Sequence, residues 1–272
     1  MSGIVLSAGV RSNLLQLQDT SNLITQTQTR LATGKRVNSA LDNPNNYFTA
    51  QALDNRAGDL NNLLDSMSTA INTIGAANNG ISSITKLVQS AQSLTSQARQ
   101  TADSATKASL SSQFNDILAQ IGTLASDSGF NGINLIGGDD LTVTLNEDGT
   151  SKVTVKSVDY TSASTGLSIA NSANNWAASA DIDAASSDLT TALTTLRSES
   201  QKLSSGLSTV QIRQDFTKAT INTLQAGSDA LTLADSNEEG ANLLALQTRQ
   251  QLSTTALSLA SQADQNVLRL FQ

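Results

Sequence analysis

Residues 60–91 decide the fold and read LNNLLDSMSTAINTIGAANNGISSITKLVQSA. Apolar side chains recur along this stretch in pairs three residues apart, and each pair repeats after seven residues. The pairs are Leu60 with Leu63, Met67 with Ala70, Ile74 with Ala77, Ile81 with Ile84, and Val88 with Ala91. A seven-residue repeat keeps one stripe of an α-helix facing a partner helix. The stretch therefore predicts a long helix with coiled-coil packing.

Three further segments carry apolar residues at alternating spacings of three and four. The N-terminal seam covers residues 10–31 and has Ser21 and Gln28 as polar members. A shorter seam covers residues 110–124, and a long one covers residues 189–231. An antiparallel return of the chain lets these helices pack together. We expect a mainly α protein built as a long antiparallel, coiled-coil-like helical bundle with paired terminal helices.

A break separates the N-terminal helix from the rest of the chain. Gly34 is expected to end this helix, because glycine adopts the left-handed conformation found at many helix ends. The basic residues Lys35 and Arg36 follow, and turn-forming residues then surround Pro44, the only proline. Residues 34–46 are therefore predicted to be a non-helical connector.

The middle of the chain holds the one stretch in which apolar and polar residues alternate. Residues 141–145 read LTVTL, residues 152–156 read KVTVK, and an Asp-Gly turn at 148–149 lies between them. This pattern predicts a small β-hairpin. Residues 159–175 are rich in Ser, Thr, Ala and Asn without a period, which predicts a loop or weakly ordered surface. Trp176 is expected to anchor its end.

The last helix begins with a capping-box pattern, in which Ser236 caps the first amides and Glu239 reaches back. The apolar stripe that follows is wider than one seam. A lone helix cannot bury so wide a stripe, so each amphipathic chain end needs a partner. Packing of both ends into one intramolecular bundle and packing against neighbouring copies are both compatible with the pattern.

Composition excludes several classes of function. The 16 Lys and Arg against 23 Asp and Glu give a formal charge of −7, the wrong sign for binding a phosphate backbone, so nucleic acid is not an expected partner. The chain has no Cys and no His, which removes thiolate chemistry and the commonest general base and metal ligand. We predict no enzyme activity, no cofactor and no metal site. No apolar run is long enough to cross a membrane, and residues 1–10 lack the features of a cleaved Sec signal.

Three motifs carry a resemblance to bacterial flagellins. Residues 30–44, RLATGKRVNSALDNP, closely resemble the basic, glycine-containing hinge near the N-terminus of that family. Residues 234–239, ADSNEE, and the helix after them resemble its C-terminal signature, and residues 130–135, FNGINL, resemble a third motif. Residues from about 139 to 180 are not diagnostic and leave room only for a hairpin and loops. The resemblance implies a short flagellin with little or no outer inserted domain.

The resemblance also implies an organisation and a role. Residues 1–46 and 235–272 would form a terminal helical polymerisation core with an N-terminal hinge, and residues 47–234 a helical rod. The subunit would be exported and would assemble into the extracellular flagellar filament used for swimming. Implied partners are further copies in a helical homopolymer, the flagellar export apparatus with an export chaperone, and hook-associated and cap proteins. A hook-filament junction protein or other flagellar axial protein is one alternative, and a coiled-coil adaptor of fixed size is another.

Candidate residues follow from the seams and the resemblance together. The hinge candidates are Gly34, Lys35, Arg36, Asn38 and Asp42. The candidates for the polymerisation interface are apolar residues of both terminal helices: Val10, Leu14, Leu17, Ile24, Leu31, Leu243, Leu246, Leu252, Leu259, Val267, Leu270 and Phe271. Flagellins are often O-glycosylated on outward-facing Ser or Thr, which makes candidates of Thr161, Ser162, Ser164, Thr165 and Ser168. The same residue types are also ordinary in loops.

Overall fold

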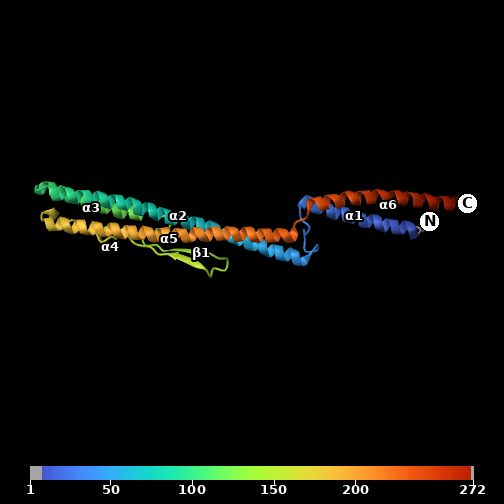
Figure 1. Ribbon diagram of the computed structural model, residues 1–272, viewed down its shortest axis with the longest axis horizontal. Coiled ribbons are helices and arrows are strands. Elements are labelled where there is room, and N and C mark those ends of the chain that lie inside the picture. Colours follow the sequence, from blue (N-terminus) through green and yellow to red (C-terminus); the bar gives the residue numbers. More distant parts are fainter. Residues whose placement is uncertain (1–7, 271–272) are drawn as a thin grey trace. The chain divides into compact units, whose positions relative to one another are not determined.

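The computed structural model describes residues 8–270, with the backbone alone at residues 264 and 267–270. The chain is mainly α-helical, as predicted, and divides into two compact units. One unit combines Met1–Arg56 with Thr223–Gln272, and the other is Ala57–Asn222. In chain order the elements are α1 (Ala8–Thr33), α2 (Pro44–Gln100), α3 (Ser104–Ser126), β1 (Leu141–Thr144), β2 (Lys152–Val155), α4 (Ala163–Gly166), the 3₁₀ turn η1 (Asn174–Trp176), α5 (Ser179–Thr232) and α6 (Ser236–Leu270) (Figure 1).

The seam predicted in residues 60–91 forms the core of the Ala57–Asn222 unit. Met67, Ile74 and Ile84 on α2 are completely buried. Each other member of the predicted pairs is also buried, except Leu63, which is half-buried. The seven-residue repeat therefore identified both the helix and the face that packs.

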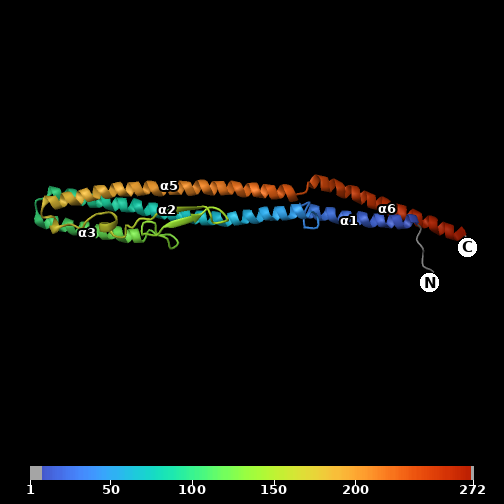
Figure 2. The ribbon, with the colours of Figure 1, turned by 90° about the horizontal axis from the view of Figure 1, so that it is seen from below.

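Helices α2 and α5 are antiparallel within this unit, and α3 lies beside them (Figures 1 and 2). Side-chain contacts between α2 and α5 advance in opposite directions along the two helices. They join Ser68 to Gln214, Asn78 to Ser200, and Arg99 to Asp183. The predicted antiparallel helical bundle is confirmed.

Helix α3 begins at the N-cap residue Asp103, whose carboxylate accepts a hydrogen bond from the amide three residues later. Phe114 and Ile121 of the predicted seam are completely buried. Leu118 and Ala125 are buried as well, although they lie outside that seam. The buried face is wider than predicted because α3 also packs against η1 and α4.

The predicted hairpin is confirmed. Strands β1 and β2 are antiparallel, with Leu141 opposite Val155 and Thr144 opposite Lys152. The connecting turn contains Gly149 at a φ of 67°, a left-handed conformation that glycine adopts without steric strain. Alternation along β1 places its buried side chains on one face.

Residues 159–175 are mostly loop, as predicted, apart from α4 and the start of η1. The segment is packed against the helices, which corrects the alternative prediction of a weakly ordered surface. Tyr160 and Ile169 are buried. Trp176 is completely buried and packs on Phe114, with ring centroids 5.1 Å apart, so its predicted role as an anchor is confirmed. Apolar residues spaced without a period gave no sequence signal, yet each fills a gap beside the helices.

Candidate assembly interface

Helices α1 and α6 pack side by side in the unit that holds both chain ends (Figures 1 and 2). They are antiparallel, because Arg30 near the end of α1 contacts Glu239 in the first turn of α6. The prediction of paired terminal helices is confirmed. The α6 residues that are partly or fully buried at this seam alternate in spacing between four and three. They are Glu239, Leu243, Leu246, Gln250, Ser253, Leu257 and Ala260.

The seam of α1 differs from the predicted one in its polar members. The buried residues are Val10, Thr20, Ile24 and Thr27. The predicted members Ser21 and Gln28 are exposed, and threonines one residue earlier take their places. The Thr20 hydroxyl donates a hydrogen bond to the Gln16 carbonyl at 2.8 Å, which satisfies that hydroxyl inside the seam. A seam with several polar members buries little apolar area.

Helix α6 is capped by Asp235 rather than by the predicted Ser236. The Asp235 carboxylate accepts hydrogen bonds from the amides two and three residues later, at 2.8 and 3.3 Å. Glu239 does not reach back to form a capping box. Its carboxylate accepts a hydrogen bond from the Arg30 guanidinium at 3.1 Å. Sequence could not separate these outcomes, because two adjacent residues can cap and Arg30 is distant along the chain.

The apolar candidates occupy three environments. Val10 and Ile24 are buried, and Leu17, Leu243 and Leu246 are half-buried at the seam. Exposed candidates are Leu14, Leu31, Leu252 and Leu259. The side chains of Val267 and Leu270, and the whole of Phe271, lie outside the described residues. The exposed leucines leave apolar surface that the chain itself does not cover.

Helix α6 carries a second apolar face. Leu244, Leu252 and Leu259 are 67%, 67% and 63% exposed. At about 100° per residue, their spacings of eight and seven place them on one side of the helix, roughly opposite the seam toward α1. The exposed leucines Leu15, Leu23 and Leu244 are not among the predicted interface residues. The adjacent leucines Leu243 and Leu244 could have indicated this second face, because neighbouring residues of a helix point in different directions.

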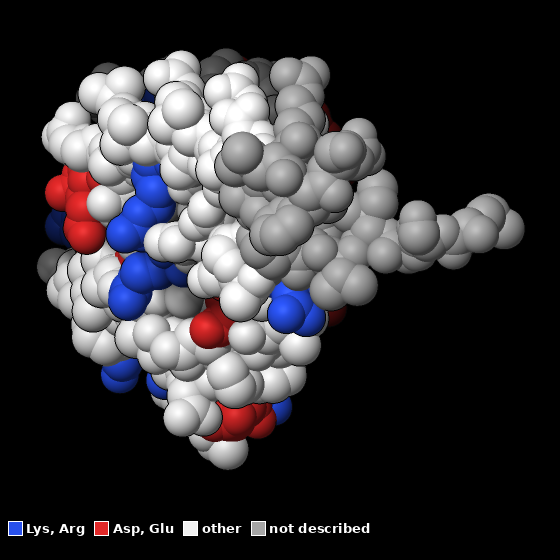
Figure 3. All heavy atoms as spheres, turned by 90° about the vertical axis from the view of Figure 1, so that its right-hand side faces the viewer, with Lys and Arg blue, Asp and Glu red and all other residues white. Residues whose placement is uncertain are grey.

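Charged residues are sparse on the terminal helices. Helix α1 contains only Arg11, Asp19 and Arg30 as charged residues. In the view of Figure 3, most of the described surface is uncharged, with one column of basic side chains and scattered acidic ones. Depletion of charge is typical of the cores of protein–protein interfaces.

The hinge, which we define as residues 34–43 between α1 and α2, is bonded to the connection between α5 and α6. The Ala234 amide donates to the Gly34 carbonyl at 3.0 Å, and the Arg36 amide donates to the Thr232 carbonyl at 2.7 Å. Gly34 has a φ of 68°, as expected for the end of α1. The two connections therefore form one hydrogen-bonded structure.

Asp42 closes a turn inside the hinge. Its carboxylate accepts hydrogen bonds from the Asn38 and Ser39 amides at 3.0 and 2.9 Å. These bonds, the one from Asn38 above all, hold the pKa of Asp42 below its ordinary value. The Asn38 side-chain amide donates to the Lys35 carbonyl at 2.8 Å. Asn38 and Asp42 thus fix the backbone of the hinge.

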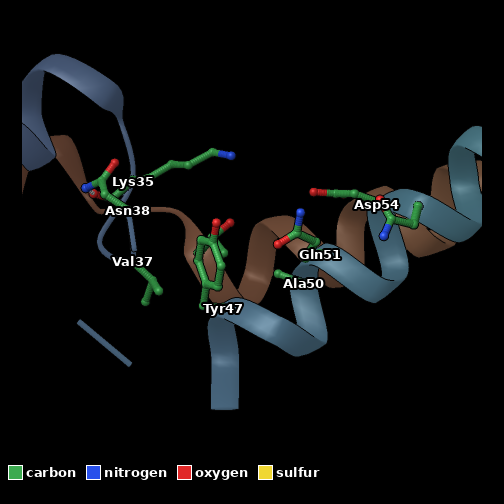
Figure 4. A pocket seen from close by; sticks show the side chains of 9 residues that line it. Lys35, Val37, Asn38, Tyr47, Ala50, Gln51 and Asp54 are labelled. Carbon is green, nitrogen blue, oxygen red and sulfur yellow. Dashed lines mark hydrogen bonds between the residues drawn. The ribbon is translucent and has the colours of Figure 1, made fainter. Parts of the chain in front are cut away.

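A recess of about 290 Å³ lies between the hinge and the first turns of α2 (Figure 4). Its charged lining residues are Lys35 and Asp54, and Tyr47 adds a phenol. The lining holds no nucleophile with an adjacent base. Across residues 8–270, no three side chains of metal-ligating type gather at one place. No helix in that range has the length and apolar character needed to cross a membrane.

Comparison with known proteins identifies the family. The bacterial flagellin N-terminal helical region matches residues 8–140, and the bacterial flagellin C-terminal helical region matches residues 181–271. Flagellin FljM of Caulobacter vibrioides is 33% identical over 279 residues, an alignment that covers 100% of this chain and 99% of that protein. The chain belongs to the bacterial flagellin family.

A second flagellin is also matched over its whole length. A flagellin of Brucella melitensis is 28% identical over 284 residues and is matched over 100% of both chains. The chain is therefore a short flagellin without a large outer domain, as the resemblance implied. A crystal structure of Bacillus cereus flagellin aligns with 57% of this chain and 88% of that one, at a TM-score of 0.47 and 20% identity.

Membership in the family gives the general role of the chain. Flagellins are structural subunits that assemble as homopolymers into the flagellar filament, an extracellular appendage used for motility. This flagellin is a filament subunit.

The O-glycosylation candidates of this flagellin differ in accessibility. Thr161, Ser164, Thr165 and Ser168 are exposed, and Ser162 is half-buried. The Thr161 hydroxyl donates to the Asp159 carboxylate at 2.5 Å, and the Ser162 and Ser164 hydroxyls share a hydrogen bond at 3.0 Å. Thr165 and Ser168 are thus the more accessible acceptors, and glycosylation of this segment stays a prediction.

Proposed function

We propose that neighbouring copies bury the exposed leucines of α1 and α6, which makes these helices the polymerisation core of the filament. The observation that carries this proposal is the second apolar face of α6, formed by Leu244, Leu252 and Leu259. Full burial of a leucine side chain is worth about 1.5–3 kcal/mol. A head-to-tail contact repeated between identical subunits extends into an open helix.

The polar seam between α1 and α6 supports the same proposal. Thr20, Thr27 and the Arg30–Glu239 pair occupy positions that apolar residues hold in a strong coiled coil. The packing of α1 against α6 is therefore weak within one chain. Assembly with neighbouring copies supplies the apolar burial that the two helices lack. We assign residues 1–46 and 235–272 to the core and residues 47–234 to the rod, including surface loops at about 139–180. The first boundary lies within the first turn of α2, and the second lies just before α6.

Further partners belong to this proposal because the family implies them. The subunit engages the flagellar export apparatus, an export chaperone, and hook-associated and cap proteins. It carries out no catalysis, since a chain without Cys or His lacks most nucleophile–base pairs.

The experiment that tests the core replaces Leu252 and Leu259 with Ser in one variant. Thr255→Ser, on the same exposed side of α6, is the matched control. We expect the double variant to lose sedimentable filaments while its circular dichroism stays helical, and the control to polymerise normally. Deletion of Ser236–Gln272 should have the same effect. Filaments of normal yield from either altered chain would overturn the proposal.

The alternative role of a hook-filament junction protein makes a different prediction. A filament subunit propagates long filaments from purified chain and a short seed, whereas a junction protein adds a bounded layer. Electron microscopy of the seeded reaction separates the two roles, and growth that stops after a short fixed length would favour the junction protein.

A further inference from the structure

A tight turn follows α3 at residues 130–133, before β1 begins. The Phe130 amide donates to the Ile133 carbonyl at 2.9 Å, and the Ile133 amide donates to the Phe130 carbonyl at 3.1 Å. Asn131 and Gly132 occupy the tip with φ values of 50° and 80°, and both are exposed. This Asn-Gly pair lies outside the terminal helices that we propose as the polymerisation core.

The reactive groups of this pair are free. Within residues 8–270, neither the Asn131 side chain nor the Gly132 amide makes a hydrogen bond. Apart from its two neighbours in the chain, no residue places an atom within 4 Å of the position that a Cβ of Gly132 would take. Glycine has no side chain to hinder the approach of its own amide nitrogen to the preceding residue.

We propose that Asn131 is a site of spontaneous deamidation in the folded subunit. The Gly132 amide nitrogen loses its proton to hydroxide and attacks the side-chain carbonyl carbon of Asn131. A bond forms between that nitrogen and carbon, the carbon–nitrogen bond of the side-chain amide breaks, and ammonia leaves. Water then opens the five-membered succinimide ring to aspartate or isoaspartate. The only co-reactant is water.

The chain contains a second Asn-Gly pair, Asn79 and Gly80, which the fold protects. This pair lies inside α2, where each amide is bonded to the carbonyl four residues earlier. Gly80 is buried, and side-chain atoms of Ser128 and Ile136 fill the space beside it. Ring closure at Asn79 requires local opening of a packed helix. Ring closure at Asn131 requires opening of only the two hydrogen bonds between Phe130 and Ile133 in a surface turn.

Deamidation of Asn131 changes the turn between α3 and the hairpin. It adds one negative charge to a chain of formal charge −7. Isoaspartate also lengthens the backbone by one methylene group inside a four-residue turn. The turn leads directly to Asn134, whose side-chain amide donates to the Ala125 carbonyl at the end of α3 at 2.7 Å. The modified turn is expected to loosen this attachment.

The test compares both pairs in the same protein. Full-length subunit is incubated at mildly alkaline pH, folded or in urea, and peptide mass spectrometry follows the gain of 1 Da at each site. We expect Asn131 to react at least about tenfold faster than Asn79 in the folded chain, because only Asn79 needs helix opening. In urea the two rates should converge, and Asn131→Gln should abolish the fast reaction. A folded-state ratio below tenfold, or the same ratio in urea, would overturn the proposal.

Discussion

Glu239 shows how one side chain sets the register of two distant segments. Glu239 is 8% exposed, and its carboxylate binds Arg30 across the seam of α1 and α6. The Arg30 Nε atom is buried without a hydrogen-bond partner, so the guanidinium depends on Glu239 for its stabilisation. A buried ion pair of this kind aligns the helices more than it strengthens them.

Replacing Glu239 with Ala should loosen the terminal pair. The change leaves the Arg30 guanidinium unpaired, at a cost of roughly 1–3 kcal/mol. Amide hydrogen exchange in α1 is expected to accelerate. Glu238→Ala, one residue away and exposed, is the control and should change exchange only slightly. Equal exchange in the two variants would show that the ion pair does not hold the helices.

Asp140 anchors the base of the hairpin through three hydrogen bonds. Its carboxylate accepts from the Lys156 amine at 2.6 Å, and from the Ser157 amide and hydroxyl at 2.8 and 3.0 Å. The Lys156 hydrogen bond above all lowers the pKa of Asp140 from 3.8 to about 2. Because folding favours the ionised form, this stabilisation is complete above about pH 4 and is lost as the pH falls through about 2.

Lys156→Ala should therefore raise the pKa of Asp140 back toward its ordinary value. A carboxyl-carbon NMR titration is expected to show a midpoint near 2 in the native chain and a higher midpoint in the variant. Lys152→Ala, at the other end of β2, should leave the midpoint unchanged. Identical midpoints in the native chain and in Lys156→Ala would contradict the assignment to Lys156.

At the scale of elements, two glycines in helices differ in what packs against them. Gly122 lies in α3 where its Cα faces the Thr161 carbonyl oxygen, and an added methyl group would collide with that backbone atom. Gly75 lies in α2 with no atom within 4 Å of the corresponding position. The first glycine permits the middle segment to approach α3, and the second has no such packing role.

Alanine substitutions should separate these two functions. Gly75→Ala is expected to stabilise the chain by up to about 1 kcal/mol through helix propensity. Gly122→Ala gains the same propensity but displaces the Thr161 backbone, so we expect a lower melting temperature and faster exchange in residues 159–169. Thermal unfolding by circular dichroism measures both effects, and an equal increase in melting temperature would refute the close contact.

At the scale of the whole molecule, the two units differ in how fully they are packed. The Ala57–Asn222 unit contains large side chains that are completely buried, among them Trp176, Phe114 and Met67. The unit with both chain ends relies on the α1–α6 seam, where buried threonines alternate with apolar residues. Local stability follows buried apolar contact, so the terminal unit should open more readily.

Limited proteolysis of unassembled subunits should therefore cut the terminal unit first. We expect early cleavage within α1 and α6 and a resistant fragment that spans most of Ala57–Asn222. Assembled filaments should resist cleavage at the same sites, because the proposed interface would cover the leucine faces. Cleavage that begins within Ala57–Asn222 would contradict this order of stability.

The sequence by itself determined the long helices, the packing faces of α2 and α5, and the hairpin. Heptad pairs such as Met67 with Ala70 and the alternation in 141–145 are local periodicities, and a period specifies which side of an element is buried. The hinge motif also predicted the left-handed Gly34. The family followed from linear motifs, which need no knowledge of contacts.

Only the tertiary structure decided which side chains meet across long separations. It showed that Thr20 and Thr27, rather than Ser21 and Gln28, enter the seam, and that Glu239 binds Arg30 instead of capping its own helix. It also separated the covered leucines from the exposed face at Leu252 and Leu259. The physical reason is that periodicity fixes a face within one helix, whereas the register and rotation between two helices depend on the packing of both.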